Sequence, residues 1–271
     1  MSRWLPVQIL LFAMAGAACA QSPVDHQHKA WTALLAKHVV LVEGGKASQL
    51  RYAGMAEDRV ALKAYLDMLA RPTEQDFRSW DKPAQVAFLI NAYNANMVEL
   101  ILTRYPKIQS VWDFGKVFNN PFKQRFIKLL GRDVSLDMIE HDTLRAKGSY
   151  DEPRIHFAVN CASIGCPMLR EEAYTGARLE AQLEEQTRRF LSDRSRNRYD
   201  PAAHELNVSE IFRWYREDWE SGYRGIKSRE QFFATYAAQL AESAPQQLRI
   251  REQKAAIRHL EYDWRLNDSR R

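Results

Sequence analysis

The chain has 271 residues, of which 46% are hydrophobic and 27% are charged, and its formal net charge is +5. This is the composition of an ordinary globular protein, long enough for one large or two small domains with a hydrophobic core. The basic residues are interspersed with acidic ones, so the sequence does not predict a surface that binds nucleic acid.

The first twenty residues predict a signal peptide rather than part of the fold. Arg3 precedes an apolar run over residues 5–18, and Ala18-Cys19-Ala20 has the small residues of a cleavage site. The run is too short to span a membrane as a helix, and the residues before Cys19 fit lipoprotein processing poorly. We therefore expect cleavage after Ala20, export to the periplasm or beyond the cell, and no integral membrane segment in the remaining chain.

Apolar residues at helical spacing predict amphipathic helices from Asp25 to Val42 and from Glu57 to Ala70. A third helix, from Pro83 to Tyr105, is apolar on nearly all sides and should be buried. Asn91 and Asn94 lie three residues apart in this helix and therefore share a face. Their amides either brace loops or line a site, where they would orient a histidine or donate to an oxyanion.

The next segment, residues 123–134, predicts a hairpin. Ser135 is then suited to cap a helix from Leu136 to Arg145, which carries Glu140 and His141. Adjacent side chains on a helix point roughly 100° apart. One of these two side chains could therefore face a neighbouring strand while the other does not.

The stretch from Arg154 to Pro167 contains both cysteines that follow the predicted cleavage site. Apolar and other residues alternate over residues 155–160, which predicts a strand, and a glycine and a proline then predict a turn. Such a strand would carry His156 and would deliver Cys161 to the loop at its C-terminal end. Loops at strand ends commonly present reactive groups.

Cys161 and Cys166 allow three interpretations. As a nucleophile, Cys161 needs a base, for which the sequence offers His156 or His141, oriented by Glu140 or by an asparagine. In a straight strand His156 would lie about 16 Å from Cys161, so the chain must turn sharply if the two are to meet. As a structural pair, the cysteines would form a disulfide after export. The third interpretation is a redox protein that cycles this pair.

The remaining chain predicts further helices and short strands. The helices are expected at residues 175–191, 209–219, 228–241 and 245–253, and the strands at residues 198–199, 205–208 and 259–264. No internal repeat or low-complexity linker is present. A single α+β domain over residues 21–271, mostly helical with a small antiparallel sheet, is the simplest organisation.

The sequence contains no metal-binding spacing, no Gly-rich phosphate loop and no Gly-x-Ser-x-Gly motif. We therefore predict no metal, no other cofactor and no serine-based hydrolase. The expected partner is an unidentified small-molecule or peptide substrate, and nucleic acid is not expected.

Four motifs occur in order between residues 85 and 218. They are Phe88-Leu-Ile-Asn91-Ala-Tyr93-Asn94-Ala, Ser135-Leu-Asp-Met-Ile-Glu140-His141-Asp-Thr-Leu-Arg145, Arg154-Ile-His156-Phe-Ala-Val-Asn-Cys161-Ala-Ser163 and Ile211-Phe-Arg-Trp214-Tyr215-Arg-Glu-Asp218. Together they resemble the DUF547 family, a domain of unknown function. The resemblance runs from about residue 85 to residue 218, and we expect it to cover most of the chain after the signal peptide. It places polar family positions on Asn91, Asn94, Glu140, His141, His156 and Cys161.

The resemblance also implies a relationship to papain-like thiol enzymes and hence a Cys/His/acid site. It implies Cys161 as nucleophile, His156 or His141 as base and Glu140 as orienting carboxylate. The expected activity is that of an exported hydrolase or acyl transferase acting on peptide or amide bonds. The alternative is a non-catalytic envelope domain for binding or scaffolding, held by a Cys161–Cys166 disulfide.

Overall fold

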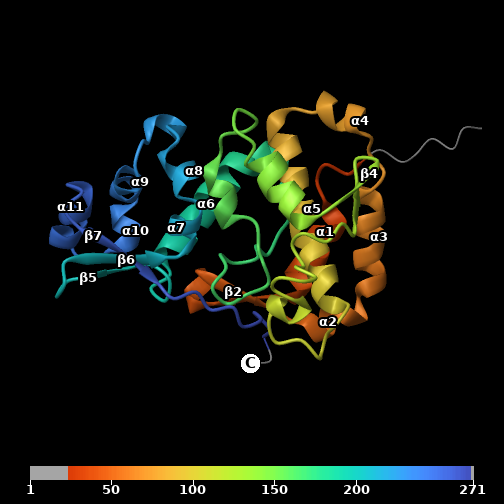
Figure 1. The fold of residues 1–271 in the computed structure, drawn as a ribbon, viewed down its shortest axis with the longest axis horizontal. Coiled ribbons are helices and arrows are strands. Elements are labelled where there is room, and N and C mark those ends of the chain that lie inside the picture. The colour runs from red at the N-terminus through yellow and green to blue at the C-terminus, as the bar shows by residue number, and fades with distance from the viewer. Residues whose placement is uncertain (1–23, 270–271) are drawn as a thin grey trace, which may run out of the picture.

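A computed structural model describes residues 24–269 of the chain (Figure 1). The predicted signal peptide, residues 1–20, lies outside the described residues, so its cleavage stays a prediction. Within the described range, no helix is both long enough and apolar enough to cross a membrane. This part of the chain is mostly helical with short strands, as predicted for an α+β protein.

The α-helices are, in chain order, α1 (Lys29–His38), α2 (Tyr52–Glu57), α3 (Arg59–Leu69), α4 (Glu74–Ser79), α5 (Lys82–Leu102), α6 (Leu179–Ser192), α7 (Ile211–Trp214), α8 (Arg216–Glu220), α9 (Arg229–Thr235), α10 (Ala237–Leu240) and α11 (Ala244–Arg251). The strands are β1 (Val39–Val42), β2 (Ala47–Leu50), β3 (Ile127–Leu129), β4 (Arg132–Val134), β5 (Arg198–Asp200), β6 (Glu205–Ser209) and β7 (Ala256–Leu260). Short 3₁₀ turns are η1 (Glu43–Gly45), η2 (Val111–Phe114), η4 (Pro153–Phe157), η5 (Gly176–Arg178) and η6 (Tyr223–Gly225), and η3 (Met138–Leu144) is a π-helix.

Helix α5 is the centre of the larger hydrophobic cluster and confirms the predicted buried helix. It packs against α3, α6 and η3, and Figure 1 shows it between α3 on one side and α6 on the other. Asp81 caps its first turn by accepting a hydrogen bond from the backbone N–H of Ala84, and Pro83 occupies that turn, where no donor is lost. A second cluster of buried apolar residues lies around α6, α7 and α9.

The strands form three small sheets. β1 pairs with β2 and β3 with β4, each antiparallel, so the hairpin predicted over residues 123–134 is confirmed. The third sheet has the order β5-β6-β7, in which β5–β6 is antiparallel but β6–β7 is parallel. The prediction of a purely antiparallel sheet is therefore wrong. The chain between β6 and β7 forms helices α7 to α11, and such a long crossover permits parallel pairing.

The first predicted helix is too long at its C-terminal end. Helix α1 ends at His38, and the next four residues, Val39–Val42, form β1. Three of these four residues are valines, whose branched side chains favour a strand over a helix. The helical periodicity of the preceding residues therefore does not extend through them.

The strand predicted over residues 155–160 is wrong. Residues 153–157 form the 3₁₀ turn η4, which begins at Pro153 and in which the Glu152 carboxylate accepts a hydrogen bond from the backbone N–H of Arg154 at 3.0 Å. Every residue from 153 to 160 is buried. The alternation in sequence therefore does not mark an inner and an outer sheet face, and a short buried apolar run does not by itself distinguish a strand from other structure.

The helix predicted after Ser135 is present, and its cap is confirmed. The Ser135 hydroxyl accepts a hydrogen bond from the backbone N–H of Met138 at 3.1 Å. Most of this helix, η3, has π-helical geometry. π-Helical turns inside helices occur frequently at functional sites, and this one carries Glu140 and His141.

Residues 262–268 form an extended segment that we call the C-terminal strap. The predicted closing strand over residues 259–264 is displaced, because β7 ends at Leu260. The strap instead makes single β-bridges to three separate parts of the chain, pairing Asp268 with Leu50, Arg265 with Ser110 and Leu266 with Ser163. It therefore joins the N-terminal hairpin, the loop after α5 and the loop that carries the cysteines.

Candidate functional site

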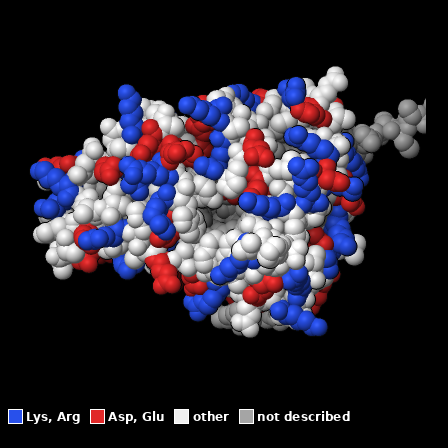
Figure 2. All heavy atoms as spheres, in the orientation of Figure 1, with Lys and Arg blue, Asp and Glu red and all other residues white. Residues whose placement is uncertain are grey.

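A cavity of about 460 Å³ opens beside η3 and the C-terminal strap. Its walls combine aromatic rings, both cysteines, two histidines and two carboxylates. They are formed by Tyr93, Trp112, Asn120, Phe122, Asp137, Glu140, His141, Arg145, His156, Val159, Cys161, Cys166, Pro167, Ile211, Trp214, Tyr215, Tyr262 and Trp264. A second, wider groove of about 870 Å³ shares His141 and Arg145 with this cavity. Figure 2 shows Lys and Arg side chains interspersed with acidic ones over one face of the molecule.

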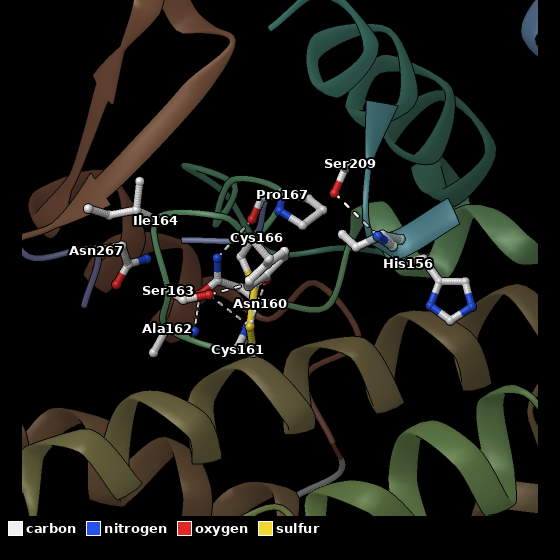
Figure 3. Close-up of a disulfide and its surroundings, with 12 residues drawn as sticks. His156, Asn160, Cys161, Ala162, Ser163, Ile164, Cys166, Pro167, Ser209 and Asn267 are labelled. Carbon is white, nitrogen blue, oxygen red and sulfur yellow. Dashed lines mark hydrogen bonds between the residues drawn. A yellow bond between two sulfur atoms is a disulfide. The ribbon is translucent and has the colours of Figure 1, made fainter. Parts of the chain in front are cut away.

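Cys161 and Cys166 are joined as a disulfide, with their Cα atoms 6.3 Å apart (Figure 3). Cys166 is buried, whereas Cys161 is partly exposed to the cavity. Three groups contact the sulfur atoms. The Tyr262 hydroxyl lies 3.2 Å from Cys161 Sγ and 3.1 Å from Cys166 Sγ, and the Ser163 hydroxyl lies 3.1 Å from Cys161 Sγ. The backbone N–H of Cys161 donates to Cys166 Sγ at 2.9 Å.

Asn94 fixes the backbone of the loop that carries the cysteines. Its amide nitrogen donates to the carbonyl of Ala158 at 2.9 Å, and its amide oxygen accepts from the backbone N–H of Asn160 at 2.8 Å. The Asn160 side chain continues this support by donating to the Pro167 carbonyl at 2.8 Å and accepting from the N–H of Ala162 at 2.9 Å. The loop is therefore held from helix α5 by a chain of buried amide hydrogen bonds.

Asn91 makes the same kind of contact with another segment. Its amide oxygen accepts from the backbone N–H of Tyr174 at 3.0 Å, and its amide nitrogen donates to the Tyr174 carbonyl at 2.7 Å. Neither Asn91 nor Asn94 lines the cavity. Of the two interpretations left open by the sequence, the structure shows these amides bracing loops.

His156 is 2% exposed and is held at one ring nitrogen only. Its Nε2 lies 2.7 Å from Asp218 Oδ2, and its ring stacks on Tyr215 with centroids 3.8 Å apart. The buried Nδ1 has no hydrogen-bond partner, and the nearest carboxylate oxygen, Oε1 of Glu140, is 3.9 Å away. Of the two residues that share the η3 helix, Glu140 is thus the one that approaches His156.

Asp218 is an ionised acceptor at neutral pH. Although burial acts in the opposite direction, hydrogen bonds from His156 and Arg145 lower the pKa of Asp218 to about 2. Arg145 donates to both carboxylate oxygens, at 2.6 Å and 3.1 Å. Because an ionised carboxylate only accepts hydrogen bonds, the proton of the neutral imidazole belongs on Nε2 of His156. Its Nδ1 then carries a free lone pair.

Burial also keeps His156 neutral. It lowers the pKa of His156, and the favourable contact with Asp218 only partly opposes this effect. The result is an unprotonated imidazole at neutral pH, with Asp218 fixing its tautomer. A neutral histidine oriented by a carboxylate is the arrangement of a general base.

His141 is placed differently. Its Nδ1 accepts a hydrogen bond from Arg145 Nη1 at 2.8 Å, and its Nε2 lies 3.8 Å from Asp137 Oδ1. Among the described residues, neither His141 nor His156 hydrogen-bonds to a cysteine sulfur, and Figure 3 shows the His156 ring apart from the disulfide. The structure brings both histidines and Cys161 to one cavity without joining them.

The residues that could bind a metal do not form a metal site. Within residues 24–269, no group of three or more His, Cys, Asp or Glu side chains is arranged to hold a metal ion. The acidic and histidine side chains of the cavity are instead paired with Arg145, with one another or with tyrosine hydroxyls.

The family model described as "Protein of unknown function, DUF547" matches residues 77–191. Residues 77–191 thus match a DUF547 domain. No curated protein and no solved structure matches the chain.

The matched DUF547 domain contains all six residues predicted for the site, but not the whole cavity. Helix α5, η3 and the cysteine loop belong to it. Asp218 and Tyr215, from α8 and the residue before it, lie beyond its end, as does Tyr262 of the C-terminal strap. The walls of the cavity therefore come from the DUF547 domain together with the chain that follows.

The sequence prediction missed the partner of His156. We expected Glu140 to orient the base, whereas Asp218 makes that hydrogen bond and Glu140 approaches the opposite nitrogen. One signal for Asp218 was present, since it closes the fourth motif, three residues after Tyr215. That spacing puts both side chains on one face of the helix predicted over residues 209–219.

Proposed function

We propose that the cavity is the active site of a thiol-dependent hydrolase or acyl transferase acting on peptide or amide bonds, with Cys161 as the nucleophile. One observation carries the proposal: Cys161 lines the same cavity as His156, and Asp218, behind the wall of that cavity, holds His156 by a hydrogen bond. In this proposal His156 is the base and Asp218 holds its tautomer, the role expected earlier for Glu140. A nucleophile, a base and an orienting carboxylate are the parts that thiol acyl transfer requires.

The proposed nucleophile must first be released from the disulfide. Two thiols of an external reductant would be oxidised to a disulfide while Cys161 and Cys166 take up the two electrons and two protons as free thiols. Cys161 is the more exposed cysteine. The hydroxyls of Ser163 and Tyr262 would then donate hydrogen bonds to its thiolate, which lowers a thiol pKa.

The base and the nucleophile need not touch before substrate binds. Catalytic hydrogen bonds are often long or absent without substrate and form in the complex. Nδ1 of His156 carries the free lone pair and is the nitrogen without a partner. It is therefore the atom proposed to take the thiol proton, once the bound substrate has brought Cys161 and His156 together.

The test uses two matched variants that each free one cysteine without a reductant. In Cys166→Ser, we expect iodoacetamide to alkylate Cys161 with a pH midpoint well below the ordinary thiol pKa of about 8.5. In Cys161→Ser, the buried Cys166 should react slowly at every pH. Adding His156→Gln to Cys166→Ser should return the Cys161 midpoint toward the ordinary value. An unshifted midpoint in Cys166→Ser would contradict the proposal.

The same variants test turnover. Reduced wild-type protein and Cys166→Ser should hydrolyse a member of a peptide and amide substrate panel that Cys161→Ser leaves intact. If reduced wild type and Cys161→Ser show equal activity on every substrate that is turned over, Cys161 is not the nucleophile.

The disulfide itself favours a second candidate function, a non-catalytic binding or scaffold domain of the cell envelope. A closed disulfide leaves no nucleophile, and the aromatic walls of the cavity suit a bound ligand. This candidate predicts that Cys161 stays unlabelled under mild thiol reductants and that Cys161→Ser retains ligand binding.

Two further expectations belong to the proposal. Export to the periplasm or beyond is supported by the signal-like residues 1–20 and by a cysteine pair suited to an oxidising compartment. A papain-like arrangement rests on the resemblance to the DUF547 family, which implies a Cys/His/acid site. Mass spectrometry of the mature N-terminus tests the first expectation, and Gln21 is the residue expected there.

A further inference from the structure

Two hydrogen-bond acceptors face each other inside the cavity with no donor between them. Nδ1 of His156 is buried and without a partner, and Oε1 of Glu140 lies 3.9 Å from it. The tautomer set by Asp218 leaves Nδ1 unprotonated. A lone pair and a carboxylate at this separation repel each other, and a group that donates to both would relieve the repulsion.

The charge of Glu140 is not neutralised by a neighbouring cation. Glu140 is 6% exposed, and among residues 24–269 the only basic side chain within ion-pair distance of it is His156, which burial keeps neutral. Arg145 is near enough to interact with Glu140, but its guanidinium is bound by both oxygens of Asp218. The hydroxyls of Tyr93 and Tyr215 donate hydrogen bonds to Glu140, which stabilise the carboxylate without cancelling its charge.

Aromatic rings form another part of the wall of the same cavity. Trp264 lies between Trp112 and Trp214, with ring centroids 5.0 Å and 5.7 Å away, and Tyr262 lies 4.5 Å from Trp264. Their planes are inclined to one another by between 24° and 61°. Glu140 acts electrostatically on Tyr262, which places the carboxylate close to this wall. The negative faces of aromatic rings attract cations, most strongly when water is excluded.

We propose that the cavity binds a primary ammonium group, which donates hydrogen bonds to Nδ1 of His156 and to the Glu140 carboxylate while its carbon chain lies against the aromatic wall. Nδ1 of His156 and Oε1 of Glu140 are 3.9 Å apart, so one ammonium nitrogen can lie about 2.9 Å from each of them and donate a hydrogen bond to both. A water molecule satisfies the same two acceptors but leaves the charge of Glu140 unbalanced. An ammonium group satisfies both requirements.

The inference names the group released by the proposed enzyme as a primary amine. When the amide C–N bond breaks, Nδ1 of His156 passes the proton that it took from the Cys161 thiol to the leaving nitrogen, so the amine lies against Nδ1 only after that nitrogen has acted as base. This assignment of the amine rests on the proposed function. Binding of the ammonium group needs neither a free thiol nor turnover. The experiment can therefore use the disulfide-bonded wild-type protein, and its failure is distinct from failure of the thiol chemistry.

Three small probes separate the contributions of charge, of N–H donors and of the carbon chain to binding by the wild-type protein. n-Butylammonium is a cation with N–H donors, butyltrimethylammonium is a cation without them, and 1-butanol has a similar chain without charge. Calorimetric titration near pH 7.5, with tryptophan fluorescence as a second signal, gives the three affinities. We expect n-butylammonium to bind roughly tenfold or more tightly than either of the others, because it alone makes charge-assisted hydrogen bonds. Equal binding of n-butylammonium and 1-butanol overturns the inference.

Substitution of Glu140 provides the matched test. Glu140→Gln keeps the shape of the side chain and removes its charge, so the affinity for n-butylammonium should fall roughly tenfold or more and that for 1-butanol should not change. Asp142→Asn removes an exposed carboxylate from the same helix and should change neither affinity. Should Glu140→Gln fail to fold, the comparison of probes on the wild-type protein still decides. Tighter binding of butyltrimethylammonium than of n-butylammonium would overturn the role of His156 Nδ1 and leave an aromatic cation site only.

Discussion

Asp218 controls the tautomer of His156 in the cavity wall. It accepts one hydrogen bond from His156 and two from Arg145. These contacts fix which nitrogen of the imidazole carries the proton. They also hold the guanidinium of Arg145 against Asp218 rather than in an ion pair with Glu140.

Replacing Asp218 with asparagine should therefore weaken His156 as a base while keeping a side chain of the same shape beside it. In the Cys166→Ser background, we expect Asp218→Asn to slow alkylation of Cys161 at pH 6 by about tenfold to a hundredfold, because the tautomer and the charge balance of His156 are lost. Rates of iodoacetamide labelling, read by mass spectrometry, measure the change. The adjacent exposed residue supplies the control, since Glu217→Gln should leave the rate unchanged. Equal rates for both variants would remove Asp218 from the proposed mechanism.

Helix α5 acts as the rigid support of the cysteine loop. Asn94 connects the helix to the backbone at Ala158 and Asn160, and both of those groups are buried. Leaving buried backbone groups without partners costs free energy, because they have already lost their hydrogen bonds to water.

We accordingly expect Asn94→Ala to lower the free energy of unfolding by about 2–4 kcal/mol, since two buried backbone groups lose their partners. Asn96→Ala is a matched control on the same helix. Its amide donates only to the Ala92 carbonyl, which the helix already satisfies, so its cost should stay below about 1 kcal/mol. Urea denaturation of the disulfide-bonded proteins measures both. A similar loss in the two variants would mean that the loop does not depend on Asn94.

Elements with a strong local pattern could be predicted from the sequence, whereas contacts between distant segments could not. The buried helix α5, the β3–β4 hairpin and the Ser135 cap follow from residue periodicity and capping chemistry. The turn at His156 was mistaken for a strand because burial on both sides leaves no sheet face to recognise. The pairing of His156 with Asp218 joins residues separated by 62 positions, and no local period encodes such a contact.

At the scale of the whole molecule, the segment that matches DUF547 does not contain all the residues that form the cavity. Residues 77–191 lack Asp218, Tyr262 and the strap, and the larger core cluster also draws residues from α1 and α3. We expect a fragment of residues 77–191 to remain without a cooperative unfolding transition, since much of its apolar surface would be left uncovered. Residues 24–269 should show a cooperative transition. Circular dichroism during thermal unfolding distinguishes the two, and a cooperative fragment would contradict the expectation.

Buried histidines should limit the stability of the protein toward acid. Burial lowers the pKa of His28 to about 4, from an ordinary value of 6.5, although Asp25 opposes the effect. In the unfolded chain His28 is protonated below pH 6.5, whereas in the folded protein it stays unprotonated until the pH falls to about 4. Stability attributable to His28 is present above pH 6.5 and falls as the pH decreases through this window.

His28 should account for about 2–3 kcal/mol of the decline in unfolding free energy between pH 7 and pH 4.5, at about 1.4 kcal/mol per pKa unit. His28→Asn cannot titrate, and asparagine tolerates the left-handed backbone found at this position, where φ is 47°. The variant should lose less stability than the wild type over the same pH range in urea titrations. Replacing the exposed neighbour, His26→Gln, should leave the wild-type decline in place.

The C-terminal strap is the last part of the cavity wall to be synthesised. A ribosome completes the cysteine loop about a hundred residues before it reaches the strap, at a rate of roughly 5–20 residues per second. Contacts such as that between Leu50 and Asp268 span most of the chain, and contacts over so long a separation form late. Until the strap docks, Tyr262 does not cover the two cysteines. Because an exported chain meets an oxidant only outside the cytoplasm, the interval in which the oxidant can reach both thiols lies between the passage of the cysteine loop and the docking of the strap.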